Sequence, residues 1–179
     1  MSGLPGAAAL AAGAVRETER LRLRFFEERD LDALSAMYAD PETMRHIGEG
    51  KTLTRPETWR AIAGMLGHWA LRGHGMWALE LKSTGELVGR AGTLDPEGWP
   101  EFELGWLVAR PHWGQGYAAE AARAALDHAA TALGRKRVVS LIRPGNAPSI
   151  RVAEKLGMRP EKEILFLGAP VIVHAAALA

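Results

Sequence analysis

The chain has 179 residues, 47% of them hydrophobic, which is enough for one sizeable core and short for two. Its 22 lysines and arginines nearly balance 21 aspartates and glutamates, which argues against a nucleic-acid or charged-membrane ligand, because a DNA-binding protein would show a basic excess. The sequence has no cysteine. This excludes disulfides, thiolate metal sites and a cysteine acyl-enzyme, and it fits a reducing cytoplasm. No run approaches the roughly 18 apolar residues of a membrane-spanning helix.

The first sixteen residues differ in composition from the rest. They are small, rich in alanine and glycine, and uncharged until Arg16. A signal peptide would need a basic start and a leucine-rich core, and this segment has neither. We expect residues 1–16 to form a flexible tail, because chain termini are commonly mobile, and residues 17–179 to form a single domain.

In chain order, the periodicity and the turn residues predict strands first and then strand–helix alternation, the pattern of a mixed α/β sheet. Asp30 is expected to cap one helix, and Thr54 and Glu57 form the capping box of another. Strands are expected at 20–26, 76–82, 87–94, 101–108, 138–142, 164–167 and 171–174. Helical segments are expected at 31–38, 41–47, 55–71, 118–129 and 148–156.

The segment from Glu101 to Ala130 organises the chain. Its first part, Glu101–Val108, is largely apolar and has the polar Glu103 within it, as expected for a buried strand. A Trp-Gly-Gln-Gly turn follows, and then an alanine-rich stretch whose small residues recur at helical spacing. Such a turn gathers free backbone N–H groups at the positive end of the helix dipole, and glycine lets the main chain approach a ligand. The pattern therefore predicts a pyrophosphate site.

Two other phosphate-binding patterns fit this turn less well. The Rossmann fingerprint tolerates Ala119 at its third position but requires an acidic residue about 20 positions later. Asp127 comes too early, and the next strand ends at Ile142 without one. The Walker loop is excluded because no Gly-Lys-Ser/Thr follows. A Gly-x-Gly turn alone is weak evidence, so a second motif at residues 146–157, NAPSIRVAEKLG, carries much of the argument.

Together the two stretches resemble the acyl-CoA-binding motifs of the GNAT superfamily of N-acetyltransferases, and most closely its Rim-type branch, which acts on ribosomal-protein N-termini. The matching runs are Trp-Gly-x-Gly-Tyr-Ala-x-Glu at 113–120 and Asn-x-x-Ser-x-x-x-x-x-Lys-Leu-Gly at 146–157. One helix and one strand separate them, as in that branch. With weaker signals, the resemblance extends from about Glu17 to the C-terminus. It departs at Pro111, where the superfamily often has Gln or Arg, which weakens that side-chain contact but leaves the backbone cradle.

The resemblance implies a GNAT-like fold, a mixed α/β sheet of about seven strands flanked by about four helices, with acetyl-CoA as cosubstrate. Trp113 is expected to pack under the glycine turn, and Tyr117 to contribute its amide. Asn146 either binds the pantetheine amides or caps the following helix. The expected cofactor contacts are Leu107, Val108, Trp113, Gly114, Gln115, Gly116, Tyr117, Ala118, Asn146, Ser149 and Lys155.

Moving an acetyl group from a thioester to an amine requires a neutral amine, a stabilised oxyanion and a departing thiolate. An α-amino group has a pKa of about 7.7–8.0 and a lysine about 10.4, so an N-terminal substrate needs less help from a base. Glu103 is the candidate base, acting through water, or else an outward-facing strand residue without a role. Alternation places Glu101 on the same face. By resemblance, the oxyanion donor is the N–H near Val108, and Ser149 is the proton donor to the thiolate unless it caps its own helix.

Other charged residues carry less information. Arg151 and Lys155 are the candidates for binding the 3′-phosphate of CoA, whereas Arg110 and the basic run 135–137 are expected to be solvated. The six histidines are scattered without an i,i+4 pair, so no metal site is expected.

No segment carries a recognisable acceptor motif. By analogy, the amine lies between the first two helices, the 47–53 loop and the final hairpin. We predict a cytoplasmic acetyl-CoA-dependent N-acetyltransferase, monomeric or homodimeric, that binds neither nucleic acid nor membrane. It would acetylate a primary amine directly, without a covalent enzyme intermediate. The acceptor is a protein N-terminus or a small amine such as an aminoglycoside, polyamine or amino acid. A non-catalytic CoA-binding module and a mononucleotide-binding protein are the competing functions.

Overall fold

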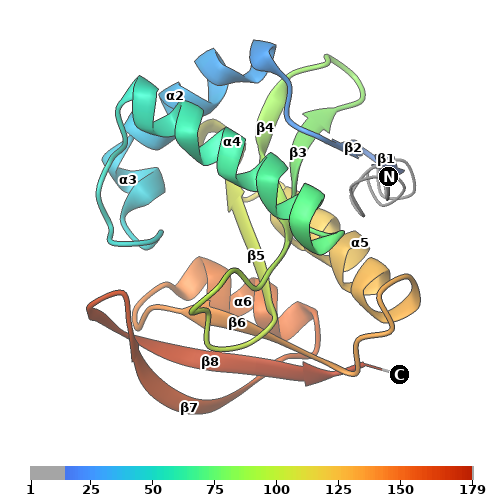
Figure 1. Cartoon of the computed structure of the whole chain (residues 1–179), viewed down its shortest axis with the longest axis vertical. Coiled ribbons are helices and arrows are strands. Elements are labelled where there is room, and N and C mark those ends of the chain that lie inside the picture. The colour runs from blue at the N-terminus through green and yellow to red at the C-terminus, as the bar shows by residue number, and fades with distance from the viewer. Residues whose placement is uncertain (1–14, 179) are drawn as a thin grey trace, which may run out of the picture.

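The computed structural model describes residues 15–178, which form an eight-stranded mixed sheet with helices on both faces (Figure 1). The strand order is β1-β2-β3-β4-β5-β6-β8-β7, and only β5 and β6 pair in parallel within the described chain. The strands are β1 Val15–Glu17, β2 Leu21–Arg24, β3 Met76–Leu81, β4 Leu87–Leu94, β5 Glu103–Val108, β6 Arg137–Ile142, β7 Arg159–Phe166 and β8 Ala169–Ala177. The α-helices are α2 Leu31–Ala39, α3 Pro41–Met44, α4 Arg55–Arg72, α5 Tyr117–Thr131 and α6 Ala147–Lys155.

Helices α5 and α6 cover one face of the sheet. The small-residue stripe of α5 is fully buried at Ala121, Ala125 and Ala129, and the helix packs against β4 and β5. The same core takes in the indoles of Trp69 and Trp77, whose ring centroids lie 4.8 Å apart. The alanine spacing in the sequence therefore marks the face of α5 that is removed from water.

Helices α2, α3 and α4 belong to the opposite face. Their core includes Leu34 and Tyr38 of α2 and Ile62 of α4, together with Ala78 and Leu107 from the sheet. Residues next to Ala78 and Leu107 in the sequence belong to the α5 core, as the alternation of side chains along a strand requires. The capping box predicted at Thr54 is present, and α4 ends at the left-handed Gly73.

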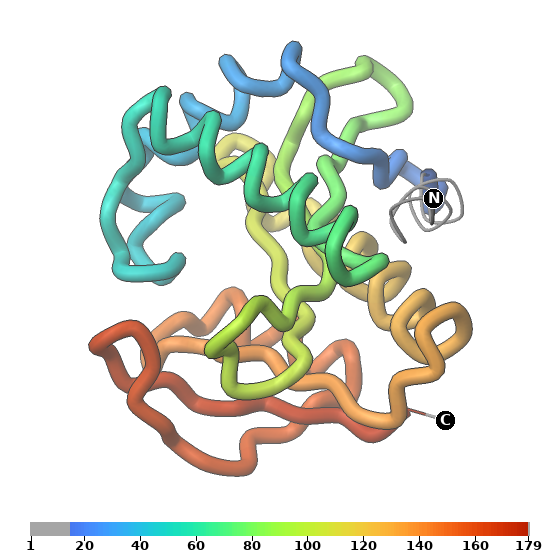
Figure 2. Tube along the Cα trace, viewed as in Figure 1, coloured from blue at the N-terminus to red at the C-terminus, as the bar shows by residue number. Residues whose placement is uncertain are grey.

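The sheet divides where β5 meets β6. These two strands share a single residue pair, Glu103 with Val139, whereas β5 pairs with β4 along its whole length. Figure 2 shows the consequence: β5 joins an upper part of the molecule to a lower part formed by β6, α6, β7 and β8. The strands separate toward the C-terminal end of β5, which positions the functional site.

The observed elements differ from the predicted ones at both ends of the chain. The predicted tail, residues 1–16, lies outside the described residues except for Val15 and Arg16, which begin β1. The final hairpin is longer than expected, because pairing to β8 extends β7 back to Arg159 through a charged segment with no strand-like alternation. The resulting eight strands and five α-helices remain within the mixed α/β class that the sequence predicted.

Two local predictions were wrong. The strand expected from Glu101 begins only at Glu103. Asp30 does not cap α2 with its side chain. Its carboxylate instead forms a buried ion pair with Arg24, whose guanidinium lies 2.7 Å from Asp30 Oδ2, and it also accepts from the backbone N–H of Glu27 at 2.8 Å. A charge partner six residues earlier in the chain, in β2, thus takes the place of the local cap.

Candidate active site

The C-terminal half of β5 leaves main-chain groups free between the separated strands. Ala109 N donates to Val88 O at 2.8 Å, toward β4. Since successive N–H groups in a strand point to opposite sides, the N–H of Val108 faces the side on which β6 has diverged. Val108 O accepts from the Trp113 indole N–H at 2.7 Å. The indole thus ties the end of β5 to the glycine turn.

The glycine turn has the conformation that its sequence predicts. Gly114 and Gly116 have φ values of +77° and +86°, in the left-handed region where residues with a Cβ are strained. A Cβ at Gly114 would meet no atom within 4 Å, so the backbone conformation, not crowding, favours glycine there. Helix α5 begins at Tyr117, and its first main-chain bond runs from Glu120 N to Gly116 O. The preceding N–H groups of the first turn therefore have no helical acceptor and point out of the helix end.

An ion pair fixes this helix end to the sheet. Glu120 accepts from Thr18 Oγ1 at 2.6 Å and from Arg20 Nε at 2.7 Å. Arg20 also donates to Gln115 O at 2.8 Å, and its guanidinium carbon lies 4.5 Å from the centroid of the Tyr117 ring. The motif residues Gln115, Tyr117 and Glu120 are thus held in one geometry through a single arginine in the connection between β1 and β2.

A long groove of about 630 Å³, which we call the long groove, runs over this turn. Of the expected cofactor residues, all but Gln115 line it, and Gln115 lies in the turn itself. Arg45, Arg151 and Lys155 add positive charge to its walls, as expected for two of them. Outside the groove, Arg110 pairs with Asp40, and Arg137 pairs with Glu101 and Glu161. The long groove therefore offers both backbone donors and cations to a polyanionic ligand.

The second motif forms α6, which borders the groove. Asn146 is its N-cap and accepts from Ser149 N at 3.3 Å, so the asparagine both caps the helix and lines the groove. Ser149 is the third helical residue rather than the cap. Its hydroxyl makes no hydrogen bond within residues 15–178, and the residue lines the cavity. The capping role left open for Ser149 falls instead to Asn146.

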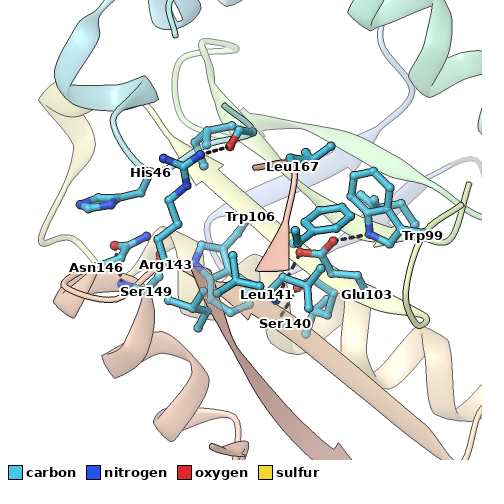
Figure 3. Close-up of a pocket in the computed structure, with 18 of the residues that line it drawn as sticks. His46, Trp99, Glu103, Trp106, Ser140, Leu141, Arg143, Asn146, Ser149 and Leu167 are labelled. Carbon is cyan, nitrogen blue, oxygen red and sulfur yellow. Dashed lines mark hydrogen bonds between the residues drawn. The ribbon is translucent and has the colours of Figure 1, made fainter. Parts of the chain in front are cut away.

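A smaller cavity of about 230 Å³, which we call the side cavity, contains Glu103 (Figure 3). Trp99 Nε1 donates to Glu103 Oε2 at 2.6 Å, and Leu141 N approaches Oε1 at 3.4 Å. Burial raises the pKa of Glu103 to about 7, although the bonds from Trp99 and Leu141 and the charge of Arg90 oppose the rise. Glu103 thus faces a cavity and can exchange a proton near neutral pH.

The two cavities adjoin each other, because five residues line both. The residues that line both of them come from the segment after α3, from β5 and from the start of α6. They are His46, Ile47, Trp106, Asn146 and Ser149. The side cavity is bounded by Gly48 and by Leu167 of the β7–β8 turn, the region where the sequence placed the acceptor. Two ligands can therefore meet beside Ser149 and Trp106.

Glu101 does not share this environment. Its carboxylate pairs with Arg137 at 3.0 Å and with Lys162 at 3.3 Å, which holds its pKa below the ordinary value. It lies before β5 begins and does not line the side cavity. Of the two glutamates that alternation grouped together, only Glu103 lies in the cavity.

The sequence analysis did not identify several residues that line the side cavity. Arg90, Trp99, Trp106 and Arg143 line the side cavity, but they come from β4, the loop after it, β5 and the end of β6. No motif joins them, because the sheet topology brings them together. The one available signal was position: Trp106 lies in the same strand as Glu103, and Arg143 directly follows β6.

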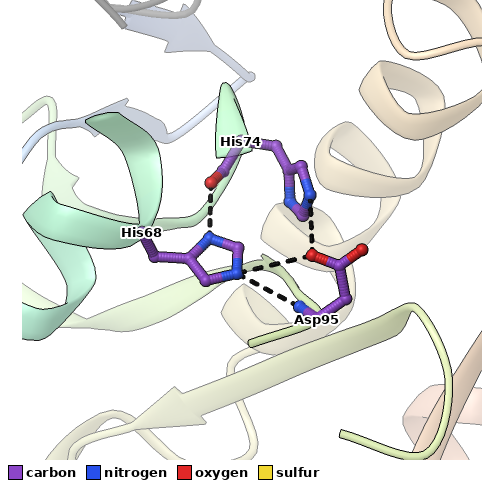
Figure 4. A group of neighbouring side chains, drawn as sticks. All are labelled: His68, His74 and Asp95. Atoms are coloured by element: carbon purple, nitrogen blue, oxygen red, sulfur yellow. Dashed lines mark hydrogen bonds and ion pairs between the residues drawn. The ribbon is translucent and has the colours of Figure 1, made fainter. Parts of the chain in front are cut away.

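A second group of titratable side chains lies at the start of the loop that carries Trp99 (Figure 4). His68 Nδ1 lies 2.7 Å from His74 O, and His68 Nε2 accepts from Asp95 N at 3.2 Å. His74 Nε2 lies 3.1 Å from Asp95 Oδ1, and Arg135 approaches the other oxygen at 3.5 Å. Histidines that are separated in sequence thus converge with Asp95, which spacing alone could not show. Their mutual contacts fasten this loop to α4 and β3.

The fold is that of an acetyltransferase. The chain matches the acetyltransferase (GNAT) domain family over residues 20–159 and belongs to this family of N-acetyltransferases. It is 38% identical over 165 residues to the uncharacterized protein YkkB of Bacillus subtilis (strain 168), covering 88% of this chain and 92% of that protein. An acetyltransferase from Agrobacterium tumefaciens str. C58 has a TM-score of 0.79 at 35% identity, covering 90% of this chain and 93% of its own.

The resemblance to the Rim-type branch also has a structural counterpart. RimL, described as a ribosomal L7/L12 α-N-protein acetyltransferase, was solved with coenzyme A. It has a TM-score of 0.76 at 19% identity, covering 92% of this chain and 98% of its own. The recognised family and fold class are thus confirmed. Among the described residues, no helix is long and apolar enough to cross a membrane.

Proposed function

We propose that this N-acetyltransferase binds acetyl-CoA in the long groove and transfers the acetyl group directly to a primary amine in the side cavity. The acceptor is a protein N-terminus or a small molecule. The observation that carries the proposal is that the two cavities adjoin and share lining residues, among them Asn146 and Ser149. The diphosphate fits the end of α5, where unpaired N–H groups and the helix dipole favour an anion. The cationic side chains of Arg151 and Lys155 lie along the same groove.

Glu103 serves as the base in this proposal. An acceptor amine reacts as the neutral form, so its N–H proton must leave, directly or through a water molecule, to Glu103. With a pKa near 7, the carboxylate is available at neutral pH yet basic enough to take the proton. The Trp99 N–H holds one carboxylate oxygen at 2.6 Å and leaves the other directed toward Leu141. An ordinary exposed glutamate, with a pKa of about 4.3, would be a much weaker base.

Val108 and Ser149 would stabilise the negative charges that develop on the acetyl carbonyl oxygen and on the departing sulfur. The free N–H of Val108 points into the gap between β5 and β6, where it would donate to the acetyl carbonyl oxygen as negative charge develops. The unbonded Ser149 hydroxyl would donate a proton to the departing sulfur and regain one from solvent. A CoA thiol resembles cysteine, with a pKa of about 8.5, so it leaves without a strong acid. Ser149 is therefore expected to contribute less than Glu103.

The same geometry favours transfer without an acyl-enzyme. The chain has no cysteine, and the adjoining cavities allow both substrates to be bound at once. The kinetics should then be sequential, with both substrates bound before CoA leaves. A cytoplasmic location belongs to this proposal and rests on the cysteine-free sequence.

Cofactor binding is tested by thermal unfolding with acetyl-CoA, CoA, ATP and buffer alone. A ligand at 100 times its Kd stabilises the native state by about 2.7 kcal/mol, a rise in Tm of a few degrees. Both CoA species should shift Tm and ATP should not. Gly116→Val should remove the shift by forcing a branched residue into the left-handed region. Gly134→Val is the control, because Gly134 also has a positive φ of +61° but does not line the long groove.

Turnover separates an enzyme from a non-catalytic CoA-binding module. Free thiol should appear when acetyl-CoA is mixed with amines or peptides that have free N-termini, and Glu103→Gln should lose this activity while keeping the CoA-dependent rise in Tm. A shift in Tm without thiol release from any acceptor would support the binding module. No shift with either CoA species would refute the cofactor assignment itself.

A further inference from the structure

The side cavity has an unusual charge content for a site that receives an amine. Its lining includes one carboxylate, Glu103, but two guanidinium groups, Arg90 and Arg143. His46 also lines it, and burial together with Arg45 and Arg143 lowers the pKa of this histidine, so it is neutral at neutral pH. An enzyme for polyamines or aminoglycosides needs carboxylates to balance several ammonium groups. This cavity offers the opposite balance.

Arg90 is held in place by a neutral group. It projects from β4, and its Nε donates to the Tyr38 hydroxyl at 2.7 Å, with the guanidinium carbon 5.9 Å from the ring centroid. It forms no ion pair with any described carboxylate, unlike Arg24, which pairs with Asp30 and Glu80 at 2.7 Å each. Tyr38 thus orients Arg90 without neutralising it, and the terminal nitrogens keep donors for a ligand.

Arg143 is held in a similar way from the other side of the cavity. In Figure 3 its side chain extends from the end of β6 toward the 46–48 segment, where a terminal nitrogen donates to Gly48 O. It too forms no ion pair with a carboxylate among the described residues. A backbone carbonyl fixes its position but leaves the full positive charge. Two oriented, partly buried arginines that form no ion pair with a described carboxylate are an arrangement suited to an anionic group supplied by a ligand.

We propose that the acceptor is a small amine that carries a carboxylate, bound with its amine toward Glu103 and its carboxylate toward Arg90 and Arg143. This rests on the proposed function and specifies the substrate class for the same cavity. The cavity volume of about 230 Å³ suits a molecule of amino-acid size. The indoles of Trp99 and Trp106 and the ring of Phe166 give the remaining wall an apolar character. A free amino acid with an apolar side chain combines these features.

The test compares amines that differ only in the anionic group. Proteinogenic α-amino acids, each with its α-amide, and spermidine are assayed for CoA-thiol release. A charge-assisted hydrogen bond contributes about 1.5–3 kcal/mol, so the acid should exceed its amide in kcat/KM by roughly 10- to 150-fold. The amide has the less basic amine and hence more of the reactive neutral form. A preference for the acid therefore cannot arise from amine protonation.

Variants test whether the two arginines cause the preference for the acid over its amide. Arg143→Gln and Arg90→Gln should each reduce the acid-to-amide ratio of kcat/KM at least tenfold, mainly through the KM of the acid. Arg143→Lys, which keeps the charge, should recover part of the ratio even if the glutamine variants lose stability. Arg60→Gln is the matched control, because Arg60 is exposed on α4 and has no carboxylate partner in the described chain. It should leave the ratio unchanged.

The outcomes distinguish this inference from the function on which it rests. Acetylation of spermidine or of the amides in preference to the acids would overturn the inference and leave the acetyltransferase proposal intact. A preference for the acids that survives in both glutamine variants would also overturn it. Failure of acetyl-CoA to release thiol with any amine, or to raise Tm, would instead remove the proposed function.

Discussion

Glu103 shows how one side chain acquires a role from its surroundings. The sequence marks it only as a carboxylate in an otherwise apolar strand. The structure gives it two opposing influences: burial, the larger, which raises its pKa, and the Trp99 and Leu141 N–H groups with Arg90, which lower it. The balance near 7 places its titration in the range where acetyl transfer to an α-amino group is feasible. The pH dependence of the reaction should therefore follow that balance.

Glu103→Gln should reduce kcat by about 10²- to 10⁴-fold, the usual contribution of a positioned base, with little change in CoA binding. In the wild type, kcat/KM should rise with pH up to about 7, because the carboxylate must be ionised to accept a proton. In the variant this inflection should disappear. The measurement is the pH–rate profile with two acceptors of different amine pKa, since an inflection that moves with the acceptor belongs to the amine. Wild-type turnover in Glu103→Gln would remove Glu103 as the base.

Trp99→Phe tests the hydrogen bond that opposes burial. The indole N–H at 2.6 Å favours the ionised carboxylate, so its removal should raise the pKa of Glu103 further. The inflection of the pH–rate profile should then move to higher pH, and activity at pH 6 should fall more than activity at pH 8. Phenylalanine keeps a ring that can pack on Phe166, which lies 4.7 Å from Trp99 in an edge-on contact. An inflection at unchanged or lower pH would contradict the assigned role of Trp99.

Some of the predicted site residues could be recognised because their role depends on the conformation of the main chain. Gly114 and Gly116 are recognisable because left-handed backbone requires glycine, and Asn146 because a cap has a fixed offset from its helix. Arg90 and Arg143 have no such offset. They line the same cavity only because β4 and β6 lie on either side of β5 in the sheet. No short sequence pattern encodes this long-range relation.

At the scale of elements, sequence patterns predicted correctly those features that depend on residues within a single segment. The capping box of α4 and the small-residue stripe of α5 are local, and both are present as predicted. The extended β7 is not local: its charged first half becomes a strand through pairing with β8. Asp30 is another failure of the capping rules, although its partner lies only six residues away in the sequence. Its partner Arg24 comes from β2, and a third residue, Glu80 of β3, completes the buried network.

Asp30→Ala should therefore cost more stability than the loss of a helix cap. Removing one member of a buried ion pair costs about 3–5 kcal/mol when the remaining charge is left without a partner. Arg24 keeps Glu80 at 2.7 Å, so the loss should lie toward the lower end of this range. Loss of an N-cap costs about 1 kcal/mol. Asp40→Ala provides the comparison, since Asp40 does cap α3 by accepting from Thr43 N at 3.3 Å. The measurement is the free energy of unfolding in urea. Equal losses in the two variants would show that Arg24 is not stabilised by Asp30.

At the scale of the whole molecule, function arises from an interrupted sheet. Eight strands form one continuous ladder except at β5–β6, where a single residue pair holds the two parts together. The interruption exposes main-chain donors to one ligand and opens the side cavity to another. Burial also shifts the pKa values of several groups in the molecule. The stability of the whole protein should therefore change with pH as these groups titrate.

Stability should rise with pH between about 4 and 6.5. Burial lowers the pKa of both His74 and His128 to about 4, with Arg16 adding to the effect at His128. Histidine in the unfolded chain has a pKa of about 6.5, so the unfolded state binds more protons at both sites in this interval, and raising the pH favours the native state. Glu103 has the opposite sign: its folded pKa of about 7 exceeds the ordinary value of 4.5, so it favours the native state at low pH. Two histidines outweigh one glutamate, leaving a net positive slope.

The opposing contribution of Glu103 can be isolated by difference. Glu103→Gln removes a group that destabilises the native state once ionised, so the free energy of unfolding of the variant relative to the wild type should increase from pH 5 to pH 8. Urea unfolding at several pH values measures this difference. Glu163→Gln, at an exposed position of β7, should give a difference that changes little with pH. A difference that is equally flat for Glu103→Gln would mean that Glu103 titrates alike in the folded and unfolded states, and the pH–rate inflection near 7 would then need another source.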